Sequence, residues 1–213
     1  MNSDSLKFRL LNFRLGVKLE YVVPVINFAE LAFLLQKSGY FINNTNQIYF
    51  SGSKGAVQFY LDGMKDVFGV IATTVDDTVA TIHEIFTLTN EELDFDLNDY
   101  VGFFEFEINA NYYLQTDAYV TMAKLFQDSS DMKTLNRILK GNFAQTSLKL
   151  TPATKNINNL EWYDLTIEPK VNSAGNVLLV RVLCRGRNLK DITENAKRTE
   201  KIATSIINGV FMK

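Results

Sequence analysis

The sequence predicts an α+β protein whose strands form one antiparallel sheet, and three observations support this class. Stretches of alternating apolar and polar residues, best developed in VGFFEFEINANYY at 101–113, are typical of half-buried strands. Stretches with apolar residues at helical spacing lie between them. Both kinds of stretch follow the order β-α-β-β-β-α in each half of the 213-residue chain.

The first half, residues 1–95, begins with a strand in which apolar residues alternate with Lys18 and Glu20. A helix should follow with Asn27 as its N-cap, and a second helix should close the half with Thr74 as its cap. The first strand is expected at residues 14–23 and the first helix at 27–39. Three strands should follow at 46–52, 56–63 and 67–74, and the second helix at 76–89.

The second half, residues 96–213, begins with a strand and ends with a long helix that starts at Asn188. It contains one inserted helix near 130–140 that the first half lacks. An offset of 87 residues aligns the charged, apolar, charged pattern at 18–20 with that at 105–107. We therefore interpret the chain as an internal duplication, whose two sheets join side by side into one curved antiparallel sheet with helices on one face. The alternative is an α+β arrangement in which the repeated order of elements is coincidental.

This element order resembles the core of the TATA-box-binding protein, a doubled β-α-β-β-β-β-α saddle that lays its concave sheet on the minor groove of DNA. The resemblance covers most of the chain and rests on element order, without a matching sequence motif. Three strands are predicted after each first helix, where that family has four. The resemblance therefore implies a TBP-like fold and no functional residues.

Strand alternation separates a core face, with Phe104 and Phe106, from an open face of mixed charge. Carboxylates on the open face would repel a phosphate backbone, which favours a hydrated or partner-binding surface over a DNA-reading one. A lone tryptophan on this face would suit an interface, although packing at the sheet edge under the inserted helix is an equal alternative. The candidate protein-interface residues are Glu105, Glu107, Trp162 and Tyr60.

Charge is distributed unevenly along the chain. Residues 66–123 contain twelve Asp and Glu and no Lys or Arg, whereas 124–213 contain fifteen Lys and Arg and eight Asp and Glu. This polarity is compatible with association of like molecules or with steering of a charged partner, and equally with two solvated surfaces whose charges compensate one another. The candidate nucleic-acid contacts in the basic region are Arg185, Arg187, Lys190, Lys197, Arg198 and Lys201. Interleaved acidic residues favour an ordinary solvated helix face as the alternative.

The sequence contains one histidine, His83, and one cysteine, Cys184, so it predicts no metal site, no cofactor and no base-assisted nucleophile. Charges interrupt the N-terminal apolar residues, and no stretch is long enough to span a bilayer, so we expect a cytoplasmic protein without a membrane partner. The predicted function is a non-enzymatic binding or assembly protein that contacts another protein or a second copy of itself. The alternatives are a nucleic-acid-associated protein and an enzyme with an unrecognised carboxylate site.

Overall fold

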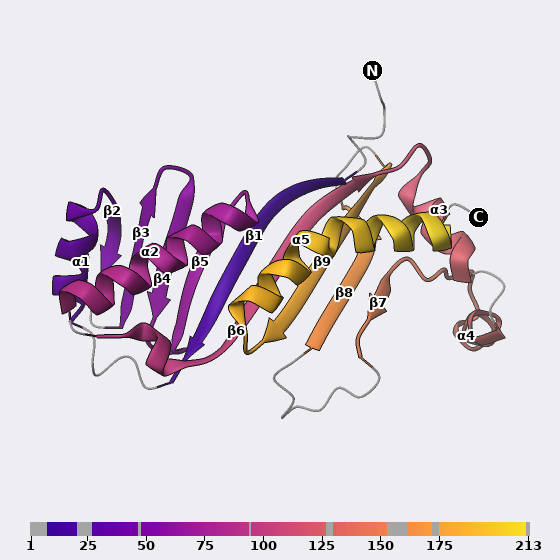
Figure 1. Cartoon of the computed structure of the whole chain (residues 1–213). Coiled ribbons are helices and arrows are strands. Elements are labelled where there is room, and N and C mark those ends of the chain that lie inside the picture. The colour runs from indigo at the N-terminus through magenta and orange to yellow at the C-terminus, as the bar shows by residue number, and fades with distance from the viewer. Residues whose placement is uncertain are drawn as a thin grey trace, which may run out of the picture.

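The computed structural model describes residues 8–20, 27–46, 48–93, 95–126, 130–152, 162–171 and 175–211. Within this part of the chain, nine strands form one antiparallel sheet in the order β2-β3-β4-β5-β1-β6-β9-β8-β7 (Figure 1). The strands are β1 (Phe8–Leu19), β2 (Phe41–Thr45), β3 (Tyr49–Lys54), β4 (Val57–Asp62), β5 (Val67–Ala72), β6 (Val101–Tyr113), β7 (Leu148–Leu150), β8 (Trp162–Pro169) and β9 (Val177–Gly186). The predicted α+β class with a large antiparallel sheet is confirmed.

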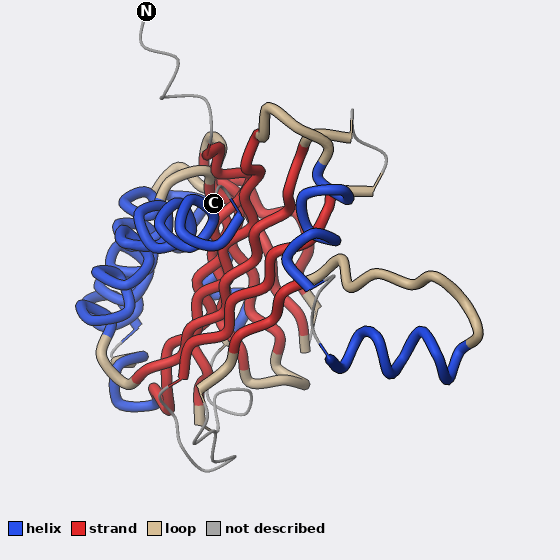
Figure 2. The backbone as a smooth tube through the Cα atoms, turned by 90° about the vertical axis from the view of Figure 1, so that its right-hand side faces the viewer, coloured by secondary structure: helices blue, strands red, loops and turns tan. Residues whose placement is uncertain are grey.

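The helices pack mainly against one face of this sheet. They are α1 (Phe28–Lys37), α2 (Val75–Leu93), α3 (Ala118–Phe126), α4 (Ser130–Leu139) and α5 (Leu189–Ile206), with a short 3₁₀ helix η2 (Leu97–Tyr100) and a π-helical turn η3 (Ile207–Phe211). Figures 1 and 2 show α2 and α5 lying side by side across the same face. We call the opposite face of the sheet the open face. Apolar residues of α1, α2, α3 and α5 join the strands in one buried cluster.

The centre of the sheet is the antiparallel pair β1–β6, which brings together two long strands far apart in sequence. The alternation predicted for β6 is confirmed, because Phe104 and Phe106 are 8% and 0% exposed. The boundary between β1 and β6, which we call the β1–β6 junction, divides the sheet in two. Strands from residues 8–72 lie on one side of it and strands from residues 101–186 on the other. The predicted boundary between residues 95 and 96 falls between α2 and η2.

The predicted N-terminal caps of three helices, Asn27, Thr74 and Asn188, are confirmed. The side chain of Asn27 accepts hydrogen bonds from the backbone N–H groups of Ala29 and Glu30, and Asn188 caps α5 in the same way. Thr74 accepts a hydrogen bond from the backbone N–H of Asp77 and shares a second contact with its carboxylate. These local contacts satisfy N–H groups that have no partner within the helix.

The prediction of three strands after the first helix is wrong for the first half, where four strands follow α1. The missed strand is β2, whose sequence FINNT has neither apolar alternation nor a buried residue. It pairs with β3 alone, at the edge of the sheet. Edge strands require only backbone hydrogen bonds on one side, so their side chains carry little signal. A helix does lie at the predicted position near 130–140, as α4, and three strands follow it among the described residues. Among the described residues, no helix has the length and apolar character needed to cross a membrane.

A polar contact joins the end of β3, at the turn to β4, to helix α2 at the β2 end of the sheet. The hydroxyl of Tyr40 donates to Glu84 at 2.8 Å, and the ammonium of Lys54 lies 2.6 Å from the other oxygen of the same carboxylate. Burial alone would raise the pKa of Glu84, but the hydrogen bonds from Lys54 and Tyr40 and the Lys54 charge outweigh it and lower the pKa. The carboxylate is therefore favoured by the folded state.

We expect Glu84→Gln to lower the free energy of unfolding by about 1 kcal/mol at neutral pH, because these partly exposed contacts lose their charge. Since folding lowers the pKa of Glu84, its contribution is present above the unfolded pKa and disappears as the pH falls through the folded pKa. Urea unfolding at a series of pH values should show the two proteins converging below about pH 4. Glu92→Gln, at an exposed position of the same helix, is the control. A difference that stays constant down to low pH would contradict this role.

Candidate functional site: the open sheet face

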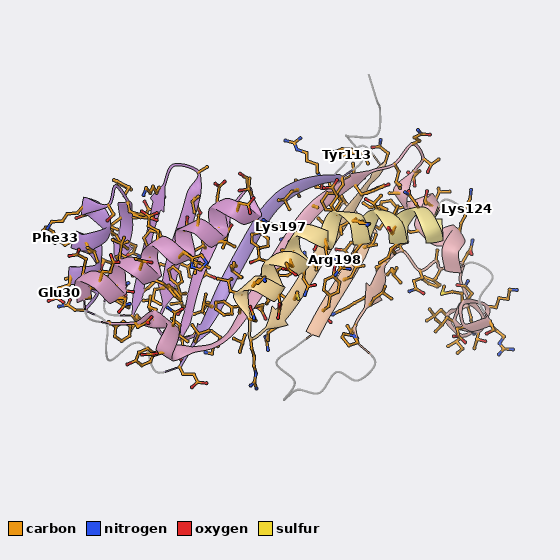
Figure 3. The ribbon with its side chains drawn as sticks, in the orientation of Figure 1. Glu30, Phe33, Tyr113, Lys124, Lys197 and Arg198 are labelled. Carbon is orange, nitrogen blue, oxygen red and sulfur yellow. The ribbon has the colours of Figure 1, made fainter. Side chains whose placement is uncertain are left out.

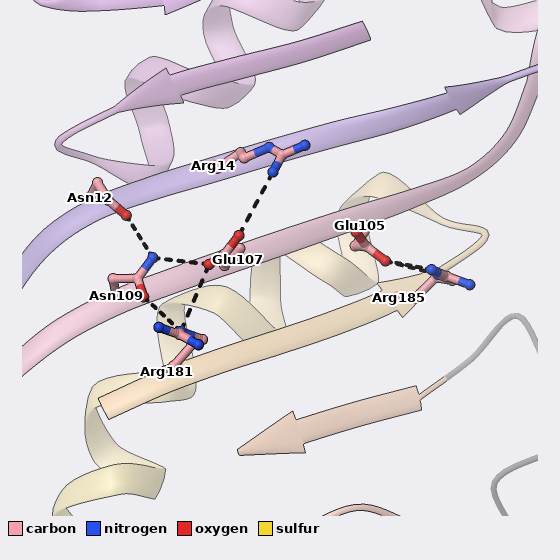
Figure 4. A network of polar contacts seen from close by, with 7 residues as sticks. All are labelled: Asn12, Arg14, Glu105, Glu107, Asn109, Arg181 and Arg185. Carbon is pink, nitrogen blue, oxygen red and sulfur yellow. Dashed lines mark hydrogen bonds and ion pairs between the residues drawn. The ribbon is translucent and has the colours of Figure 1, made fainter. Parts of the chain in front are cut away.

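The open face carries a network of charged and amide side chains from β1, β6 and β9 (Figure 4). Glu105 accepts two hydrogen bonds from Arg185, at 3.0 Å from Nε and 2.6 Å from Nη2. Glu107 lies between Arg14 at 3.8 Å and Arg181 at 4.0 Å. Glu105 stands directly opposite Arg185 and Glu107 directly opposite Arg14 in the strand register. Cross-strand neighbours are the closest side chains on a sheet face, so the register itself forms these pairs.

Asn109 extends the network toward one end of the central strands. Its amide nitrogen donates to Asn12 at 3.0 Å and to Glu107 at 3.2 Å, while its oxygen accepts from Arg181 at 3.2 Å. The amide thus links β1, β6 and β9 on the open face. Such a chain of partly exposed contacts holds the arginine heads in defined positions.

Two adjoining hollows lie in this face, and we call them together the open-face groove. The first has a volume of about 200 Å³ and the second about 410 Å³, and they share Arg14 and Val67. The residues lining the first are Arg14, Gly16, Lys18, Val67, Phe103, Glu105, Glu107 and Arg185. Those lining the second are Arg14, Tyr49, Tyr60, Asp62, Lys65, Val67 and Ile71. The groove therefore crosses the sheet from β3 and β4 to β9.

Glycine residues make the groove possible. Gly16 and Gly69 are paired neighbours on β1 and β5, and neither has a side chain to fill the open face. A Cβ at Gly69 would lie 2.3 Å from the ring of Tyr60, so this ring occupies the space above the glycine. A Cβ at Gly16 would meet nothing closer than 3.6 Å, which leaves the first hollow open above it. Strand glycines often mark such a close approach of another group.

Aromatic rings and guanidinium groups form the walls. Tyr60 stacks on Tyr49 with ring centroids 6.5 Å apart, and the Arg14 guanidinium lies 5.5 Å from the Tyr60 centroid. At the other end, the Arg185 guanidinium lies 4.2 Å from the centroid of Phe103. Burial raises the pKa of the Tyr60 hydroxyl, although Arg14 opposes the shift, so this group is a hydrogen-bond donor at neutral pH.

The structure brings together three of the four predicted interface residues, since Glu105, Glu107 and Tyr60 all line the groove. Trp162 is the first residue of β8 and pairs with Arg185 in the strand register. Its side chain lies outside the part of the chain that the structure describes. Whether any of these residues binds a partner stays a prediction.

The predicted nucleic-acid candidates do not form one surface. Arg185 belongs to the open face, whereas the others lie on the loop after β9 or on α5, in the helix layer. Figure 3 shows Lys197 and Arg198 projecting from α5. The ammonium of Lys197 lies 2.5 Å from the carboxylate of Asp76 at the start of α2. The other candidates, all of them exposed, are Arg187, Lys190, Arg198 and Lys201.

Sequence reasoning missed Arg14, Phe103 and Tyr49 as members of the site. Arg14 has the same parity on β1 as Lys18, so alternation places it on the open face and was sufficient to find it. Tyr49 lies on the far side of the hairpin from β1, and only the strand order β3-β4-β5-β1 brings its ring near Arg14. Alternation along β6 also places Phe103 on the open face. An apolar residue on a polar face does not, however, indicate that a groove is present.

The titratable side chains in and near the groove have identifiable surroundings. Its carboxylates are bonded to arginine or lysine, and no group of three His, Cys, Asp or Glu that could hold a metal ion occurs among the described residues. His83 is exposed on α2, away from the open face. Burial raises the pKa of the Cys184 thiol to about 11, and the protonated thiol packs in the core.

Comparison with known proteins adds little to this picture. No protein-family model matches the chain, and no curated protein matches it. Among solved structures, the chain is similar to a rolling circle replication initiator protein from Geobacillus stearothermophilus, with 9% sequence identity and a TM-score of 0.30. That match covers 88% of this chain and 78% of the other. A likeness at this TM-score carries no argument about fold or function.

Proposed function

We propose that this chain is a non-enzymatic binding protein and that the open-face groove receives a segment of a protein partner. The observation that carries the proposal is the composition and shape of the groove. Two arginines, two tyrosines and a phenylalanine surround hollows whose floor is left open at Gly16. Tyr and Arg are enriched among the residues that dominate protein interfaces, and they act most strongly from partly enclosed sites.

The charge pattern favours a protein over a nucleic acid. Each arginine at the first hollow is bonded to a carboxylate, namely Arg14 to Glu107 and Arg185 to Glu105. A polyphosphate backbone would need to break these pairs and would then face the released carboxylates. A polypeptide can instead place hydrogen bonds and apolar side chains between them, as in an interface with a polar rim.

The finer fold prediction is also part of this proposal. We propose that the two sides of the β1–β6 junction are pseudo-repeats with a TBP-like arrangement. Three features support it: each side has its first strand at the centre, the remaining strands run outward in reverse chain order, and each side ends in a long helix on the same face. The alignment of 18–20 with 105–107 also keeps Leu19 and Phe106 both in the core.

Selection from a display library of random peptides tests the proposed function. We expect peptides enriched on the wild-type protein to lose at least about tenfold in affinity on the Tyr60→Ala and Phe103→Ala variants, because each removes an aromatic wall of the groove. Tyr119→Ala, an exposed tyrosine on α3, is the matched control and should bind these peptides normally. Titration with a mixed-sequence duplex and a single strand should show no groove-dependent binding.

Two outcomes would overturn the proposal. One is peptide binding that all three variants retain equally. The other is tight duplex or single-strand binding that falls steeply with salt and is lost when Arg14 and Arg185 are replaced. The second outcome would assign the open face to nucleic acid.

A further inference from the structure

One row of cross-strand neighbours on the open face contains two adjacent glycines. The row crosses β4, β5, β1, β6 and β9, and its members are Tyr60, Gly69, Gly16, Glu105 and Arg185. Each member stands directly opposite the next in the strand register, where side chains on one face of a sheet normally touch. The two glycines instead leave a space two residues wide between Tyr60 and Glu105.

The ring of Tyr60 fills the half of this space that lies above Gly69. A Cβ at Gly69 would be 2.3 Å from the Tyr60 ring, so the ring stands where a side chain would be. An aromatic ring from a neighbouring strand can compensate in this way for a glycine in a sheet. The open face therefore already contains one example of a ring seated on a strand glycine.

The half of the space above Gly16 stays open among the described residues. The nearest atom to a Cβ at this position would be the carbonyl oxygen of Glu105, at 3.6 Å. The Glu105 carboxylate is bonded to Arg185 on β9, the neighbour of β6 on the side away from β1 (Figure 4). The resulting first hollow has a volume of about 200 Å³. A cavity of about 150 Å³ can hold benzene, so the hollow has room for one aromatic ring.

The groups beside the hollow suit such a ring. Arg14 and Arg185 both line it, and each guanidinium already lies close to an aromatic ring of the groove. The distance to the ring centroid is 5.5 Å from Arg14 to Tyr60 and 4.2 Å from Arg185 to Phe103. The face of an aromatic ring carries partial negative charge and attracts cations. A ring above Gly16 would lie between these two cation–ring pairs.

The carboxylates of the hollow favour a neutral occupant. Glu105 is bonded to Arg185, and Glu107 lies between two arginines. A charged ligand would have to separate one of these pairs and leave a charge without its partner. A neutral ring leaves all of them intact. A nucleobase is also a flat ring, but it brings a phosphate that the two carboxylates would repel.

We infer that the partner segment places one phenylalanine or tyrosine side chain in the first hollow, with its ring above Gly16. We call this place the ring site. The inference rests on the proposed function, because it names the side chain by which the open-face groove recognises its partner. The ring would cover the backbone of Gly16 as Tyr60 covers that of Gly69. A segment without an aromatic residue would leave the hollow unfilled.

Nuclear magnetic resonance with p-cresol, the side chain of tyrosine, tests the ring site without a partner. We expect nuclear Overhauser effects between the p-cresol ring protons and the α protons of Gly16. The saturated analogue methylcyclohexanol should bind at least about fivefold more weakly, because it has no π-system to attract the arginines.

Gly16→Ala places a methyl group on the floor of the ring site and should weaken p-cresol binding at least about fivefold. The variant should fold, because a Cβ at Gly16 meets only ordinary contact distances, and circular dichroism checks this. Gly209→Ala is the matched control. It adds the same methyl group at an exposed glycine of η3, where a Cβ would meet nothing within 4 Å, and it should bind p-cresol normally.

The selected peptides give the second test. Each peptide that depends on Tyr60 and Phe103 should contain an aromatic residue whose replacement by leucine weakens binding at least about tenfold. On the Gly16→Ala protein the same replacement should have a much smaller effect, because the peptide residue and Gly16 are coupled only if they are in contact. This double-mutant cycle identifies the peptide residue that occupies the ring site.

The outcomes separate this inference from the proposed function. Groove-dependent peptides that tolerate leucine at every aromatic position would overturn the inference and leave the proposed function intact. If p-cresol binds at Gly16 but no groove-dependent peptide is found, the ring site stands and the protein partner is refuted. If p-cresol makes no contact with Gly16, or binds the Gly16→Ala protein equally well, the ring site itself is refuted. Tighter binding of adenosine than of p-cresol at Gly16 would overturn the inference by assigning the site to a nucleobase.

Discussion

Phe106→Ala is expected to lower the free energy of unfolding by about 3–5 kcal/mol, the cost of removing a fully buried aromatic side chain. Phe106 is 0% exposed at the middle of β6, and its ring centroid lies 5.7 Å from that of Phe13 on β1. The cavity would open between the two central strands, under the helix layer. For a chain of this size, the melting temperature should fall by roughly 2–4 °C for each kcal/mol lost.

Phe33→Ala makes the same chemical change at a position that is 60% exposed. Its free energy of unfolding, measured by urea at low protein concentration, should differ from wild type by less than about 1 kcal/mol. Equal losses for the two variants would show that Phe106 does not occupy a central core position. The comparison thus tests the face assignment on which the open-face groove depends.

Gly52→Ala is expected to be destabilising by about 1–3 kcal/mol, although it adds only one methyl group. Gly52 is buried on β3, and a Cβ there would lie 2.6 Å from the carbonyl oxygen of Phe41 and 2.6 Å from the ring of Phe59. The backbone oxygen belongs to β2 and cannot rotate away. Relief therefore requires β2 to separate from β3, and amide hydrogen exchange should show loss of protection in β2.

Gly16→Ala is the matched control, because it is also a glycine within a strand of the same sheet. The nearest atom to a Cβ at Gly16 is 3.6 Å away, an ordinary contact distance. Its unfolding free energy should change by less than about 1 kcal/mol, and β2 should keep its protection. If both variants lost the same stability, a general intolerance of side chains in strands would replace the steric explanation.

Much of the fold is visible in local sequence because local physics determines it. The caps at Asn27, Thr74 and Asn188 are short-range hydrogen bonds, and the core face of β6 follows from alternation. Strand β2 is different, because its side chains are exposed and its existence depends on the backbone of β3. A pattern of side chains cannot record an interaction made by the backbone alone.

The sequence was sufficient to predict which residues share the open face, but not that they surround a groove. Alternation places Glu105, Glu107 and Tyr60 on the open face, and this is where they lie. Their partners depend on strand order and register, since Glu105 meets Arg185 only because β6 pairs with β9. The hollow at Gly16 and the ring over Gly69 require the packing of three strands, which no single stretch of sequence contains.

The position of β1 has a consequence for synthesis on the ribosome. This strand pairs with β5 on one side and β6 on the other. Both neighbours come later in the chain: β5 follows α1 and strands β2 to β4, and β6 follows α2 and η2 as well. Its two edges stay without partners until translation reaches residue 72 and then residue 113. During that interval the nascent chain exposes an apolar strand with Leu15, Val17 and Leu19. An unpaired apolar strand can pair with other chains, so a slow stretch of translation before β5 would lengthen the time during which the nascent chain can aggregate.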